Sequence, residues 1–131
     1  MTQEEKDLLL KILCEQLPYG VKVCYKIHKK DKPVIVTLSG LLLDYVKDET
    51  VVEIKPYLRL MSSMTEEEEH ELLKFGAVTH LSNDEVIDVA CVGFEYHAKV
   101  QDWLNAHHFD YRGLIERGLA LEATEEMYKW Q

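Results

Sequence analysis

The hydrophobic period of this chain changes abruptly at residues 17–20, and this change constrains the fold more than any other feature of the sequence. Before these residues, apolar side chains recur about every three or four positions, which is typical of one face of an α-helix. After them, apolar and polar residues alternate, which is typical of a half-buried strand. The chain therefore has to combine an N-terminal helix with a sheet.

The N-terminal helix has both a start signal and a stop signal. Thr2 and Glu5 have the spacing of a capping box, in which each side chain accepts a hydrogen bond from the backbone N–H of the other residue. Pro18 keeps the residue before it out of helical angles, and Gly20 permits a sharp turn. We therefore expect the helix to end at these residues.

Alternation predicts three strands after this helix. The first covers residues 21–27, and a polar hairpin loop follows over residues 28–33. The second strand begins at residue 34, and its apolar phase slips at Ser39 and Gly40, so we expect it to continue to residue 45 through a β-bulge or bend. The third covers residues 52–60, and Pro56 predicts that this strand is an edge strand or ends near the proline.

Three consecutive antiparallel strands, one of them sharply bent, predict a curled meander. We therefore expect an α+β fold with a small antiparallel sheet, an SH3-like or OB-like partial barrel, packed with the N-terminal helix and two later helices. The length fits a single domain over residues 1–131, with the first helix and the meander in residues 1–61 and a helix-rich half in residues 62–131.

The second half contains two predicted helices and a strand. Thr65 and Glu68 have the spacing of another capping box, and Gly76 is a natural end for the helix that they begin. Residues rich in β-branched side chains predict a strand over residues 86–92. The helical period returns from residue 94 to residue 108. A single helical turn over residues 114–118, a short strand at residues 119–121 and a fraying tail are expected to follow.

Four segments of the sequence resemble a family of short proteins. These segments are residues 17–21, 54–59, 61–68 and 103–115. The chain is similar there to proteins of unknown function encoded in Bacteroidetes genomes, often in prophage-like or mobile regions. Leu60 departs from the pattern of that family, which more usually has proline at this position. The resemblance implies a bacterial or phage source, and it implies no mechanism.

The charge balance argues against two classes of partner. The chain has 15 basic and 24 acidic side chains, and its formal net charge of −9 argues against a generally basic nucleic-acid binder. There is also no polybasic segment for anionic lipid. We therefore expect a protein partner and no membrane, with nucleic acid as the less favoured partner.

One local basic patch stands out in this acidic sequence. Lysines crowd the first predicted hairpin, where they favour a partner site, although lysines on the solvent face of a strand are also common. Arg112 follows Tyr111, and arginine beside an aromatic residue is a frequent interface anchor. The candidate binding residues are Lys22, Lys26, Lys29, Lys30, Lys32 and Arg112.

The cysteines and the N-terminal sequence indicate a reduced, cytoplasmic protein. Cys14, Cys24 and Cys91 are odd in number and far apart, which fits neither a structural zinc site nor a disulfide scaffold. We expect three reduced, mostly buried thiols. The N-terminal residues lack the apolar core of a signal peptide, and no apolar run approaches membrane-spanning length.

The most suggestive group for chemistry is His107, His108, Asp110, Tyr111 and Arg112. Histidine close to a carboxylate can hold a metal ion or act as a general base with its orienting partner. The favoured interpretation is structural: a helix C-terminus whose histidines complement the helix dipole, followed by a turn. We therefore expect no metal site, no cofactor and no catalytic residue.

Three functional hypotheses follow from the sequence. The first is a non-enzymatic binding or structural accessory protein associated with a phage or mobile element. The second is a nucleic-acid-associated regulatory module that uses the lysine-rich hairpin. The third is a small hydrolase or metal enzyme centred on residues 107–112.

Overall fold

The computed structural model describes residues 2–75, 77–83, 85–91 and 97–128, which form two compact units. Unit 1 consists of Met1–Leu58 and Leu114–Leu121, and unit 2 consists of Arg59–Gly113 and Glu122–Gln131. Each unit has its own cluster of buried apolar side chains. Helices and a small, mainly antiparallel sheet are both present, so the predicted α+β class is confirmed.

Unit 1 begins with the predicted helix. Helix α1 spans Gln3–Gln16. The Glu5 N–H donates to Thr2 Oγ1 (3.1 Å) and the Thr2 N–H donates to Glu5 Oε1 (3.0 Å), so the capping box is confirmed. The short 3₁₀ helix η1 (Leu17–Tyr19) follows, and Gly20 ends it with a φ of 69°. That left-handed conformation is the reason for a glycine at this turn.

The sheet of unit 1 does not have the order of a meander. Strands β1 (Lys22–Lys26), β2 (Val34–Thr37), β3 (Glu53–Leu58) and β6 (Leu121–Glu122) form a sheet with the order β2-β1-β3-β6. Strand β1 pairs antiparallel with both β2 and β3. The prediction that successive strands lie side by side is therefore correct for the first hairpin and wrong for β3.

Strand β3 neither ends at Pro56 nor lies at the edge, which corrects the sequence prediction. The Leu38 N–H donates to the Val21 carbonyl oxygen (2.8 Å), so alternate β1 residues, including Val23, hydrogen-bond to β2. Val23 is also the register partner of Pro56, and its backbone groups are therefore not used toward β3. The missing N–H of Pro56 therefore costs no hydrogen bond in the ladder to β1.

The predicted continuation of the second strand is wrong, because a helix begins at the expected bulge. Helix α2 spans Gly40–Lys47, and the Leu42 N–H donates to Ser39 Oγ (3.2 Å) at its N-cap. Leu42 and Leu43 are buried, whereas Leu41 and Tyr45 are exposed. The apolar run thus follows a helical stripe, and serine followed by glycine marks an N-cap rather than a bulge.

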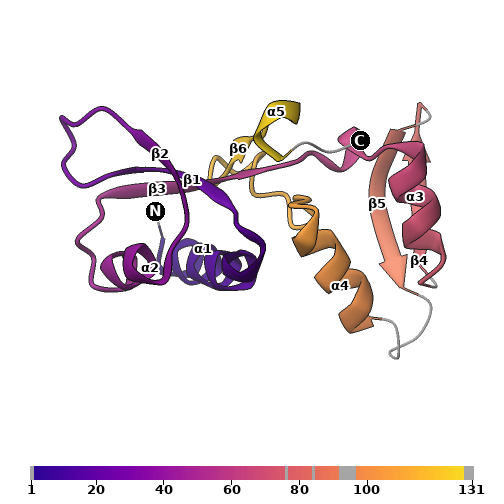
Figure 1. Cartoon of the computed structure of the whole chain (residues 1–131), viewed down its shortest axis with the longest axis horizontal. Coiled ribbons are helices and arrows are strands. Elements are labelled where there is room, and N and C mark those ends of the chain that lie inside the picture. Colours follow the sequence, from indigo (N-terminus) through magenta and orange to yellow (C-terminus); the bar gives the residue numbers. More distant parts are fainter. Residues whose placement is uncertain (1, 76, 84, 92–96, 129–131) are drawn as a thin grey trace. The chain divides into compact units, whose positions relative to one another are not determined.

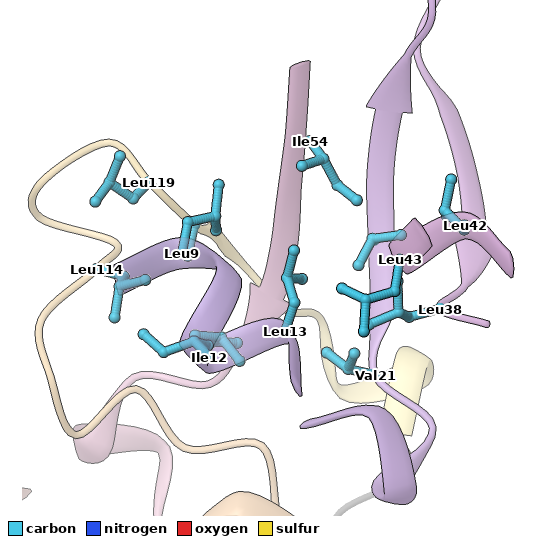
Figure 2. Packing of buried hydrophobic residues seen from close by; sticks show 13 residues of the cluster. Leu9, Ile12, Leu13, Val21, Leu38, Leu42, Leu43, Ile54, Leu114 and Leu119 are labelled. Carbon is cyan, nitrogen blue, oxygen red and sulfur yellow. The ribbon is translucent and has the colours of Figure 1, made fainter. Parts of the chain in front are cut away.

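Helices α1 and α2 lie together on one side of the sheet in unit 1 (Figure 1). Figure 2 shows leucine side chains from both helices in one apolar cluster with Val21 and with Ile54 of β3. Leu114 and Leu119 join the same cluster from the last segment of unit 1. The opposite face of the sheet carries polar side chains, which alternate with the buried ones along β1 and β3.

Unit 2 contains the other predicted elements together with a strand that the sequence analysis missed. Helix α3 (Glu66–Leu73) begins at the predicted capping box of Thr65 and Glu68. Strand β4 (Ala77–Ser82) was not predicted, and it pairs antiparallel with the predicted strand β5 (Glu85–Cys91). The unit also contains η2 (Met61–Ser63), α4 (His97–Ala106) and α5 (Glu125–Tyr128).

Several smaller predictions have other outcomes. Residues 114–118 form hydrogen-bonded turns instead of a helical turn. Cys14 is exposed because it lies on the outer side of α1, and Cys24 is half-buried, so the prediction of mostly buried thiols is wrong for Cys14. The predicted cap at Gly76, the end of the strand at residue 92 and the start of the helix at residues 94–96 lie outside the described residues.

Replacing Ser39 by alanine tests whether a helix begins there. The change removes the N-cap hydrogen bond to the Leu42 N–H, so we expect the free energy of unfolding to fall by about 1 kcal/mol in urea titrations. Ser62→Ala is the matched control because Ser62 is exposed in η2. Equal stability of the two variants would contradict the helix start.

Candidate functional site

The predicted basic residues of unit 1 gather around the β1–β2 hairpin, which projects away from α1 and α2 (Figure 1). Lys22 and Lys26 lie on β1, half-buried on the sheet face opposite the buried Val23. Lys29, Lys30 and Lys32 are exposed in the loop that joins the two strands. We call these five residues the basic hairpin.

A turn within the loop holds its backbone. The His28 N–H donates to Asp31 Oδ2 (3.2 Å), and the Asp31 N–H donates to the His28 carbonyl oxygen (3.0 Å). The carboxylate of Asp31 is therefore engaged by the loop itself. This local closure presents the neighbouring lysines to solvent on a short, ordered turn.

The lysines of the hairpin differ in their pairing. Glu53 lies 3.8 Å from Lys26 Nζ and 3.8 Å from Lys55 Nζ, so one carboxylate is shared by two ammonium groups. Within the described part of the chain, the loop residues Lys29, Lys30 and Lys32 form no ion pair. The charge available to a partner is thus concentrated at the loop.

The outer face of the sheet adds an aromatic residue and a thiol to these lysines. Tyr57 on β3 and Cys24 on β1 are half-buried neighbours on this face. Burial, reinforced by the adjacent Cys24 thiol, raises the pKa of Tyr57. The phenol therefore stays neutral at physiological pH, as an apolar surface with a polar tip.

The predicted cluster at residues 107–112 lies in unit 2, and its two histidine rings stack on different aromatic side chains. His107 stacks on Trp103 with ring centroids 4.0 Å apart, and its Nδ1 lies 2.9 Å from the Trp103 carbonyl oxygen. His108 stacks on a different ring, Tyr128, at 3.8 Å. Arg112 lies over the ring of Tyr111, with its guanidinium carbon 4.9 Å from the ring centroid.

Arg112 and the other candidate binding residues belong to different compact units. Arg112 belongs to unit 2, whereas the basic hairpin belongs to unit 1. Its guanidinium is half-buried against Tyr111, whose hydroxyl donates to Asn105 Oδ1 (3.0 Å). Arg112 therefore belongs to the segment that follows α4 in unit 2 and not to the basic hairpin.

The pKa of His108 is strongly shifted. Burial, together with the nearby positive charges of His107 and Arg59, lowers its pKa to about 4. The imidazole is thus neutral at pH 7, and its backbone has a φ of 62°, in the left-handed region. A buried neutral ring stacked on Tyr128 contributes packing at this position.

A buried ion pair that the sequence analysis missed organises unit 2. Arg59 Nη1 donates to Glu68 Oε2 (2.7 Å) and Arg59 Nη2 donates to Glu68 Oε1 (2.8 Å), so the pair is bidentate. Arg59 Nε also donates to Ser63 Oγ (3.2 Å), and its guanidinium carbon lies 4.2 Å from the Phe109 ring centroid. Arg59 is 1% exposed, which shows how fully this cation is withdrawn from water.

The same arginine connects two distant segments of unit 2 through its backbone. The Arg59 N–H donates to the His108 carbonyl oxygen (2.7 Å), and the Asp110 N–H donates to the Arg59 carbonyl oxygen (2.8 Å). Arg59 and Phe109 therefore form an isolated parallel bridge. Burial by itself raises the pKa of Glu68. The hydrogen bonds from Arg59 and Thr65, together with the Arg59 charge, lower this pKa by more than burial raises it, so the carboxyl has a pKa below its usual value.

Unit 1 also contains an open groove of about 540 Å³ between α1, α2 and the start of β3. Its lining combines apolar side chains, such as Leu9 and Ile54, with charged side chains of both signs, such as Lys6 and Asp7. This mixed lining favours no particular class of ligand.

The described residues contain neither a cluster of metal ligands nor a membrane-spanning helix. Across residues 2–75, 77–83, 85–91 and 97–128, no three His, Cys, Asp or Glu side chains come together as a metal site would require. Over the same ranges, no helix is both long and apolar enough to cross a bilayer.

No protein-family profile, curated protein sequence or solved structure matches this chain. The loop lysines of unit 1 are exposed, whereas His108 and Asp110 of unit 2 are buried.

The lowered pKa of His108 predicts an acid-sensitive stability. The unfolded chain binds a proton near pH 6.5, whereas the folded chain binds it only near pH 4, so the free energy of unfolding falls as the pH is lowered between these values. The full effect is about 3 kcal/mol. Urea titrations followed by tryptophan fluorescence measure it.

His108→Asn is the informative variant, because asparagine tolerates the left-handed backbone and does not titrate. We expect this variant to have a weaker dependence of stability on pH between about 6.5 and 4. His28→Asn changes an exposed histidine in unit 1 and should leave the dependence as it is. Identical pH profiles for His108→Asn and the unmodified chain would contradict the assignment.

Proposed function

We propose that this chain is a non-enzymatic binding or structural accessory protein that recognises an acidic segment of a protein partner through the basic hairpin. The resemblance to Bacteroidetes proteins supports a phage-associated or mobile-element-associated role in the bacterial cytoplasm. Loop lysines present charge for recognition, and the sheet behind them supplies a rigid base. For that sheet we propose an SH3-like or OB-like partial barrel, supported by its small size and its single helix-covered face.

The observation that carries this proposal is that the lysines of the basic hairpin differ in their ion pairs. Lys26 shares Glu53 with Lys55, whereas the loop residues Lys29, Lys30 and Lys32 are exposed and form no ion pair among the described residues. In a chain of net charge −9, most of the surface repels an acidic partner. A concentrated basic loop on such a surface selects both the partner and its orientation.

The cluster at residues 107–112 gives less support to the enzyme hypothesis. General acid–base catalysis requires a base and its orienting partner within hydrogen-bond reach. His107 bonds to the Trp103 carbonyl, and His108 packs on Tyr128, so the two rings belong to different stacks. Binding is therefore the function we favour.

A second candidate is a nucleic-acid-associated regulatory module that uses the same hairpin. The specific observation in its favour is Tyr57, which lies on the outer sheet face with Lys22, Lys26 and Lys55. Single-stranded nucleic acids bind to such combinations of aromatic and basic side chains. Glu53 and the overall acidity of the chain weigh against it, so we place it second.

Charge reversal at the loop tests the proposed function. We expect Lys30→Glu combined with Lys32→Glu to weaken binding of a fluorescein-labelled, glutamate-rich peptide about tenfold or more, because two attractive charges become repulsive. Fluorescence anisotropy measures the affinity, which should also fall as salt is raised. The matched control, Lys11→Glu with Lys99→Glu, makes the same change in net charge at exposed helical positions.

A single-stranded DNA oligonucleotide of equal charge distinguishes the two candidates. Tighter binding of the DNA than of the peptide, lost in the same hairpin variant, would favour the nucleic-acid module. If neither probe binds at low salt, or if the control pair weakens binding as much as the hairpin pair, the basic hairpin is not a recognition site.

A further inference from the structure

Strand β2 forms one edge of the sheet in unit 1. In the order β2-β1-β3-β6, it pairs with β1 on one side, and no other strand of the described residues pairs with it. An edge strand presents backbone N–H and C=O groups that a further strand can bond. Val34–Thr37 is thus a place where the ladder of the sheet is open.

The register identifies which backbone groups face this open edge. The Leu38 N–H donates to the Val21 carbonyl oxygen (2.8 Å), which makes these two residues a hydrogen-bonded pair. Hydrogen-bonded and non-hydrogen-bonded pairs alternate along an antiparallel ladder. Counting back from Leu38, Thr37 and Ile35 occupy the non-hydrogen-bonded positions, so their N–H and C=O groups point away from β1.

The side chains of β2 leave this edge apolar. Val34 is 47% exposed and Ile35 is 54% exposed, and the strand has no charged residue along its length. Natural edge strands are commonly protected by a charged side chain within the strand. In this protein the charges lie at one end only, in the loop that contains Lys30 and Lys32 and leads into β2.

We infer that β2 accepts an extended segment of a partner protein as an added strand, and that acidic residues of this segment lie beside the lysine-containing loop. This inference deepens the proposed function and rests on it. Backbone hydrogen bonds at Ile35 and Thr37 supply the attachment, and an alternating apolar side chain of the segment packs beside Ile35. The loop lysines set the direction, because they attract only the acidic end.

A second copy of this chain is a less suitable occupant of the edge. Two copies, each with a net charge of −9, repel one another, and the basic loop of each copy would have to offset that repulsion. A short acidic segment of a partner has its negative charges only at the end that lies beside the lysine-containing loop. Charge complementarity therefore favours a short partner segment over self-association.

The test uses the full chain and a labelled peptide in which valine and threonine alternate and glutamates follow at the C-terminus. An antiparallel strand on β2 would place these glutamates beside the lysine loop. A second peptide with the glutamates at the N-terminus tests the parallel direction. In amide hydrogen exchange measured by NMR, we expect Ile35 and Thr37 to become protected when one of these peptides is added.

Ile35→Pro is the decisive variant, because it removes an outward N–H and leaves the ladder to β1 intact. We expect it to weaken peptide binding about tenfold or more, whereas Ile35→Ala, which keeps the N–H, should weaken binding less. If Ile35→Pro does not fold, a peptide methylated at alternate backbone nitrogens gives the same test on the unmodified protein, with loss of binding expected.

The outcomes separate this inference from the proposed function. If Lys30→Glu with Lys32→Glu abolishes peptide binding while Ile35→Pro and backbone methylation have no effect, the hairpin binds acidic segments and strand addition is overturned. If neither peptide binds the unmodified chain, both the inference and its basis fail. Protection of Ile35 and Thr37 that rises with protein concentration alone would identify a second copy as the occupant and also overturn the inference.

Discussion

The buried pair of Arg59 and Glu68 is the interaction on which unit 2 depends. A charged guanidinium removed from water is tolerated only when its donors are satisfied, and here Glu68 and Ser63 accept hydrogen bonds while Phe109 covers its face. The backbone of the same residue bonds on both sides of Phe109, to His108 and Asp110. The start of α3 and the segment after α4 are therefore held by one side chain and its own peptide groups.

The same packing explains why the histidines of unit 2, which could in principle act as acids or bases, have a structural role. The pKa of His108 is low because the ring is buried close to positive charge, and the ring fills space against Tyr128. His107 continues the aromatic stack that begins at Trp103. Unit 1 differs, because its core cluster consists of apolar side chains and its loop lysines are exposed at the basic hairpin. Recognition is accordingly proposed for unit 1, and unit 2 is stabilised by buried polar groups.

Local signals were readable from the sequence, and contacts between distant segments were not. Both capping boxes depend on residues three apart, and both were predicted correctly. The run at residues 39–47 is short and fits either period, and only the N-cap bond of Ser39 decides for a helix. The lysine cluster was visible, but its partial neutralisation by Glu53 depends on the pairing of β1 with β3. Arg59 lies within the strand predicted over residues 52–60, and no sequence pattern links it to Glu68 or Phe109.

The most direct test of this account is a double-mutant cycle of Arg59→Met and Glu68→Leu, with the free energy of unfolding of unit 2 measured by tryptophan fluorescence. Each single change leaves a buried charge without its partner and should cost about 3–5 kcal/mol. Glu68→Leu also removes the hydrogen bond from the Thr65 N–H, but it does so whether residue 59 is arginine or methionine, so this cost cancels in the cycle. We predict that the double variant is more stable than additivity allows, by about 2 kcal/mol. Additive costs would contradict the claim that this pair holds unit 2 together.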